Sequence, residues 1–233
     1  MPETATSGLS KAQIPDFPRV SPDQQQQQIA AGETHPNGCT SSPLIHDIYE
    51  RKTSSWQYIV ADSATLHAAI IDPVLDYDAA TATISTENAD SLLAKIADMG
   101  YTVEMILETH AHADHITAAS FLQSRLAVKQ GLRPTIGIGR RISQVQDTFG
   151  QRYNLGRHQF DGVFDKLFDD DEVFRIGSLY AMAVHIPGHT PDHMAYRIGG
   201  KAGPTRIHHI DTGANRMDQM TTYSPAIASS TRT

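Results

Sequence analysis

The chain has 233 residues, which suits one domain or one domain with a tail. Hydrophobic residues make up 39% and charged residues 19%, while the net charge of -7 argues against a nucleic-acid or anionic-membrane surface. No apolar run reaches the roughly 18 residues that span a bilayer, and the single cysteine, Cys39, excludes an intrachain disulfide. We therefore expect a cytoplasmic protein with no membrane or nucleic-acid partner. A mitochondrial location stays open as the alternative, although the N-terminus is not arginine-rich.

The start and end of the chain differ in composition from its middle. Residues 1–42 are rich in Pro, Ser, Thr, Gly and Gln and cannot bury enough apolar surface to offset their ordering entropy. We expect a disordered leader over residues 1–42, a domain over residues 43–218 with order beginning near Leu44, and a polar tail over residues 219–233.

Apolar segments of strand and helix type alternate through the middle of the chain. A helix at 87–99 is indicated by Leu92, Leu93, Ile96 and Met99 at helical spacing, with Gly100 closing it. The predicted elements, in chain order, are strands 56–61 and 68–71, a loop at 72–78, helix 87–99, strand 103–107, helix 115–129, strand 135–138, helix 140–149, a solvated acidic turn at 169–172, and strands 180–186 and 194–198. This alternation predicts a layered α/β protein.

The residues most suited to chemistry lie in the segment THAHADH, residues 109–115, between a predicted buried strand and a predicted helix. It holds His110, His112, Asp114 and His115, and imidazole and carboxylate groups are good ligands for zinc and iron. Alternate side chains of a turn can converge, so we expect His110 and His112 to face one metal position and Asp114 and His115 to face a second. Four potential ligands at this density favour a metal site over a solvated loop.

A second candidate ligand is His189, in the segment PGHT at residues 187–190, directly after a predicted strand. A lone loop histidine is usually solvated, but the pairing with the first motif makes it a candidate ligand from another strand. His193 lies just beyond, and we expect it to pack at a strand start. The sequence assigns no catalytic acid, base or nucleophile.

Together the two motifs resemble the metal-binding pattern of the metallo-β-lactamase superfamily. The segments WQYIVAD (56–62), IIDPVLDYD (70–78), LETHAHADHIT (107–117) and IPGHTPDH (186–193) are more specifically similar to the persulfide dioxygenase branch, over residues 44–200. The resemblance implies an αββα sandwich and an enzyme that oxidises glutathione persulfide to sulfite with O₂ at a mononuclear Fe(II). His110 and His189 match its iron histidines.

The same resemblance leaves other functions open. In the hydrolase branches, residues matching His112, Asp114 and His115 complete a two-metal site, so a zinc-dependent thioester hydrolase of the hydroxyacylglutathione type is the alternative. In the dioxygenases they shape the pocket. Either reading implies a small glutathione-derived thiol substrate, and a homodimer stays open.

The pattern departs from the family after PGHT. The family's third ligand is an aspartate in a Gly-Asp pair, and residues 200–208 contain no acid. Either Asp211 supplies this ligand or the site lacks a carboxylate. We favour a C-terminally truncated chain with an incomplete sandwich, which predicts reduced stability and leaves an inactive family member as a third possibility.

Overall fold

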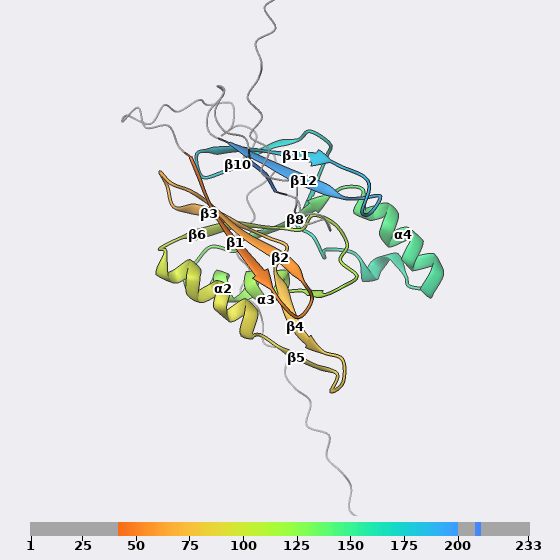
Figure 1. Cartoon of the computed structure of the whole chain (residues 1–233). Coiled ribbons are helices and arrows are strands. Elements are labelled where there is room, and N and C mark those ends of the chain that lie inside the picture. The colour runs from red at the N-terminus through yellow and green to blue at the C-terminus, as the bar shows by residue number, and fades with distance from the viewer. Residues whose placement is uncertain (1–41, 200–207, 211–233) are drawn as a thin grey trace, which may run out of the picture. The chain divides into compact units, whose positions relative to one another are not determined.

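The computed structural model describes residues 42–199 and 208–210. The expected leader, apart from residue 42, lies outside these ranges, as do the expected tail and Asp211. No helix in the described ranges is long and apolar enough to cross a membrane. The elements (Figure 1) are β1 (Pro43–Glu50), β2 (Ser55–Asp62), β3 (His67–Ile71), β4 (Val74–Asp78), β5 (Thr83–Ser85), α2 (Glu87–Asp98), β6 (Thr102–Leu107), β7 (Ile116–Thr117), α3 (Ala119–Gln130), β8 (Thr135–Gly139), α4 (Ile142–Tyr153), the 3₁₀ turn η1 (Arg157–Gln159), β9 (Lys166–Phe168), β10 (Val173–Ile176), β11 (Leu179–His185), β12 (Met194–Gly199) and β13 (His208–Ile210).

The strands form three sheets. The largest has six strands in the order β1-β2-β3-β6-β8-β9, antiparallel from β1 to β3 and parallel from β3 to β9. The second has four antiparallel strands, β10-β11-β12-β13. A small sheet, β5-β4-β7, joins a hairpin to the strand that follows the histidine-rich segment.

Two hydrophobic clusters lie on opposite faces of the six-stranded sheet, because successive side chains of a strand point to opposite faces. Along β2, β3 and β6, consecutive buried residues belong alternately to the two clusters. One cluster packs under α2 and α3, and the other packs against β10, β11 and β12 (Figure 1). The helix-side cluster includes Ile59, Ile70, Leu92, Ile106 and Leu122, and the cluster between the sheets includes Val60, Ile71, Leu107, Leu179 and Tyr196.

Most predicted elements are confirmed to within a few residues, including the strands that became β2, β3, β6, β8, β11 and β12 and the helix that became α2. Gly100 ends α2 in the left-handed region, at φ 68, where glycine has no steric penalty. The acidic turn at 169–172 is also confirmed between β9 and β10, although ion pairs tie Asp169 to Arg140 and Asp170 to Arg141.

Two predictions were wrong, for one shared reason. The loop predicted at 72–78 contains β4, and the helix predicted from residue 115 begins at Ala119. Residues Ile116–Thr117 form β7, which pairs with Val74 and Leu75 of β4. This pairing takes the backbone hydrogen bonds that a helical turn would use, and the backbone N–H of Ala118 donates to Pro73 at 2.8 Å. Strands β1, β5, β9 and β10 were not predicted.

Candidate metal centre

The histidine-rich segment leaves β6 at the edge where β3 also ends, and Asp72 at the end of β3 holds it. The carboxylate of Asp72 accepts hydrogen bonds from the backbone N–H of Thr109 at 2.7 Å and from its hydroxyl at 2.6 Å. Both residues are fully buried. The position of the following residue, His110, is therefore set by a carboxylate from the neighbouring strand.

The second motif lies between β11 and β12, in the other sheet, and hydrogen bonds join it to the first. The backbone N–H of Met194 donates to the carbonyl of Thr109 at 2.9 Å, and that of Ala111 donates to Oδ2 of Asp192 at 3.3 Å. The hydroxyl of Tyr196 on β12 donates to the carbonyl of Glu108 at 2.8 Å. These bonds bring the segments at 108–115 and 186–194 into contact.

Histidines from both motifs gather where the two segments meet. The ring centroid of His110 lies 4.1 Å from that of His112, 4.8 Å from that of His189 and 4.7 Å from that of His193. His110 is buried, whereas His189 is exposed. Burial, and then the charge on His112, lowers the pKa of His110 to about 4, so His110 is a neutral imidazole with a lone pair to offer.

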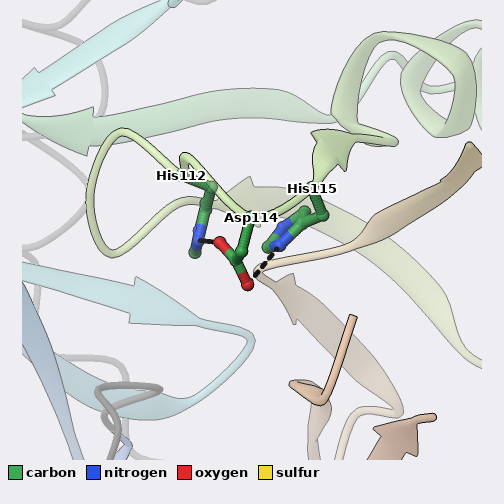
Figure 2. Close-up of side chains that lie close together, drawn as sticks. All are labelled: His112, Asp114 and His115. Carbon is green, nitrogen blue, oxygen red and sulfur yellow. Dashed lines mark ion pairs between the residues drawn. The ribbon is translucent and has the colours of Figure 1, made fainter. Parts of the chain in front are cut away.

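Three side chains of the first motif form a compact group, His112, Asp114 and His115, whose potential ligand atoms all lie within 4.8 Å of one another. Figure 2 shows the Asp114 carboxylate between the two rings, 3.9 Å from Nδ1 of His112 and 3.3 Å from Nδ1 of His115. The Asp114 side chain is 53% exposed, so this group is open to solvent on one side.

A second compact group, made of Asp72, Glu108 and His112, shares His112 with the first, and its two carboxylates are buried. Nε2 of His112 is 3.0 Å from Oδ1 of Asp72 and 3.4 Å from Oε2 of Glu108. Burial alone would lower the pKa of His112, but the two carboxylates outweigh it and raise that pKa to about 11. Burial also raises the pKa of Glu108 to about 7.

The open group has the donor set of a transition-metal site, with imidazole nitrogens and a carboxylate oxygen. Nε2 of His115 is buried and has no hydrogen-bond partner within residues 42–199. A buried nitrogen without a partner is costly, and a cation at this position would satisfy it. The enclosed carboxylates of Asp72 and Glu108 would then orient His112 through Nε2, leaving Nδ1 for the cation.

The structure thus brings the expected site residues to one place, with one difference in grouping. His112 joins Asp114 and His115 and also lies beside His110, and neither compact group in the described ranges includes His110 or His189. Sequence reasoning did not single out Asp72 and Glu108. Their position in the sequence could have indicated them, because each residue directly follows a buried strand that ends at the same sheet edge as the histidines.

Comparison with known proteins identifies the family. Residues 52–201 match the family described as the metallo-beta-lactamase superfamily, whose members bind metal ions. The chain belongs to this superfamily, and its mixed α/β architecture with two packed sheets is the metallo-β-lactamase fold.

Three curated relatives illustrate the range of names among similar proteins. The chain is 40% identical to a beta-lactamase hydrolase-like protein of Xylella fastidiosa over 76% of this chain and 40% of that protein. It is 43% identical to glyoxylase B2 of Dictyostelium discoideum over 64% of this chain and 50% of that protein. It is 32% identical to the mitochondrial persulfide dioxygenase of Bos taurus over 38% of this chain and 31% of that protein. The chain spans half or less of the length of each relative.

Proposed function

We propose that this chain is a metal-dependent oxygenase that acts on glutathione persulfide. The observation that carries the proposal is the meeting of His110 and His189, whose loops follow strands of two different sheets, with ring centroids 4.8 Å apart. The overall reaction balances as glutathione persulfide plus O₂ plus water giving glutathione plus sulfurous acid. The segments similar to persulfide dioxygenases support this substrate class.

Each part of the site has a role in this proposal. His110 and His189 are the proposed iron ligands, and bound Fe(II) would supply the redox chemistry between the persulfide sulfur and O₂. Asp72 and Thr109 fix the loop that carries His110. His189 and Asp114 are exposed, so a substrate can approach from their side. Whether Asp211, which lies outside the described residues, supplies the third ligand is decided by the Asp211→Asn variant.

Metal analysis and product analysis together test the proposal. The chain is purified without oxygen, its iron and zinc are measured per chain, and sulfite is measured after addition of glutathione persulfide and air. We expect about one iron per chain and sulfite formation. His110→Ala and His189→Ala should lose both the bound iron and the sulfite formation, and Asp211→Asn should lose the iron. The control is His158→Ala, which changes an exposed histidine on η1 and should behave as the unchanged protein.

A second function has its own supporting observation. The compact group of His112, Asp114 and His115, with the buried Nε2 of His115 unpartnered in the described ranges, suits a second metal ion. Zinc at two positions would supply Lewis acidity for hydrolysis of a glutathione thioester. Two zinc ions per chain with thioester hydrolysis and no sulfite would replace the oxygenase proposal. A folded chain that binds neither metal would leave an inactive family member.

A further inference from the structure

The hydroxyl of Thr109 links a buried carboxylate to the ring of His110. Its oxygen lies 2.6 Å from Oδ2 of Asp72 on one side and 2.8 Å from Nδ1 of His110 on the other. Thr109 and Asp72 are fully buried and His110 is 4% exposed, so both hydrogen bonds are shielded from water and are correspondingly strong. One ring of the proposed iron site is therefore connected to the end of β3 through a single hydroxyl group.

The direction of each hydrogen bond in this link follows from the groups that take part. The other carboxylate oxygen of Asp72, Oδ1, accepts from the backbone N–H of Thr109 at 2.7 Å and lies 3.0 Å from Nε2 of His112, and donors of this kind stabilise the ionised carboxylate. An ionised carboxylate can only accept, so the one proton of the Thr109 hydroxyl is donated to Asp72. Towards His110 the hydroxyl oxygen can then only accept, and Nδ1 of His110 carries the ring proton.

The position of this proton decides which nitrogen of His110 can bind a metal. Imidazole binds a metal as the neutral ring, which carries one proton. With that proton on Nδ1, the lone pair is on Nε2, on the far side of the ring from Thr109. A histidine ligand whose other nitrogen donates to the protein has a fixed tautomer and a fixed ring orientation. Asp72, Thr109 and His110 form this arrangement, with a hydroxyl between the carboxylate and the ring.

We propose that the Thr109 hydroxyl sets the tautomer of His110 and is thereby a positioning residue for iron bound by His110 and His189. Without the hydroxyl, Nδ1 of His110 loses its acceptor, and the tautomer with the proton on Nε2 becomes populated and cannot bind the metal through that nitrogen. The inference rests on the iron ligands of the proposed function, but the tautomer belongs to the metal-free chain. A purely structural role differs, because the backbone N–H of Thr109 still holds the loop to Asp72 when the hydroxyl is removed.

Nitrogen NMR of the His110 ring in the metal-depleted full chain tests the proposal, at a pH where the ring is neutral. Thr109→Val removes the hydroxyl and keeps the branched shape, whereas Thr109→Ser keeps the hydroxyl. Ser55→Ala is the matched control, because it removes a hydroxyl that lies 3.0 Å from Oδ2 of Asp114 and 3.2 Å from Nδ1 of His115, a different pair of side chains in the same centre. The unchanged protein, Thr109→Ser and Ser55→Ala should show the His110 proton on Nδ1, and Thr109→Val should show a mixture of tautomers.

Binding of Fe²⁺ without oxygen, measured against a competing chelator, gives the second readout. Thr109→Val should bind Fe²⁺ about 10–100-fold more weakly, and Thr109→Ser should bind it as the unchanged protein does. A proton only on Nδ1 of His110 in Thr109→Val would overturn the proposal. If Thr109→Val does not fold, the unchanged protein decides, because a proton on Nε2 of His110 there would also overturn it. The predicted tautomer in an unchanged protein that binds no iron would refute the oxygenase proposal and still support the role of the hydroxyl.

Discussion

Replacing Asp72 with asparagine should be among the most damaging single changes in the described part of this chain. Its carboxylate accepts two hydrogen bonds from Thr109 and lies 3.0 Å from Nε2 of His112, with all of these groups buried. Asparagine keeps the shape but turns one acceptor into a donor that faces another donor. A hydrogen bond to a charged group contributes about 1.5–3 kcal/mol, and breaking a buried ion pair costs about 3–5 kcal/mol.

We therefore expect Asp72→Asn to lower the free energy of unfolding by about 3–5 kcal/mol. Urea unfolding followed by circular dichroism measures this directly. With a slope of about 1–3 kcal/mol per molar, the midpoint should fall by at least about 1 M. The matched control is Asp98→Asn at the exposed end of α2, which should change stability by less than about 0.5 kcal/mol. A loss below about 1 kcal/mol in Asp72→Asn would refute the role assigned to the carboxylate.

Three further substitutions test other parts of the structure. Burial acts to raise the pKa of Glu50, but hydrogen bonds from the following turn outweigh it and lower that pKa. Urea unfolding should therefore show the full difference in free energy of unfolding between the unchanged protein and Glu50→Gln above pH about 4.3, the pKa of an unfolded glutamate. This difference should shrink as the pH falls through the lowered pKa that Glu50 has in the folded protein. Gly139→Ala would bring the new Cβ into collision with Cγ of Met194, so thermal melts should show a loss of stability of about 1–3 kcal/mol. Adding Met194→Ala should relieve part of this loss, and simple additivity of the two changes would contradict this packing. Tyr196→Phe leaves the buried carbonyl of Glu108 without its 2.8 Å donor and should cost about 1–3 kcal/mol, and an unchanged denaturant midpoint would contradict this.

Elements with one dominant local signal could be predicted from the sequence. The helix α2 has apolar residues at helical spacing and a closing glycine, and the runs in β3 and β6 are buried on both faces. Strand β1 was missed because it pairs on one side only, and its burial alternates weakly. Strand β7 was missed because its partner, β4, lies about 40 residues earlier in the chain, so no local pattern shows the pairing.

The same contrast applies to the candidate site. His110, His112, Asp114, His115 and His189 lie in two short motifs whose residue types show their chemistry. The residues that orient them have no such motif. Asp72 is an aspartate in a predicted loop, and Ser55 is a serine in a polar stretch. Their importance comes from folded contacts with residues 37 to 60 positions away.

The hydrogen bond from the backbone N–H of Met194 to the carbonyl of Thr109 joins the two packed sheets at the level of the histidines. Each sheet carries one of the two histidine motifs, so any sliding or parting of the sheets also separates the rings. The site can keep its geometry only while the sandwich stays closed. The exchange rate of the Met194 amide hydrogen would therefore report how often the protein opens. A metal bound by histidines of both motifs stabilises the closed sandwich, so it should slow that exchange.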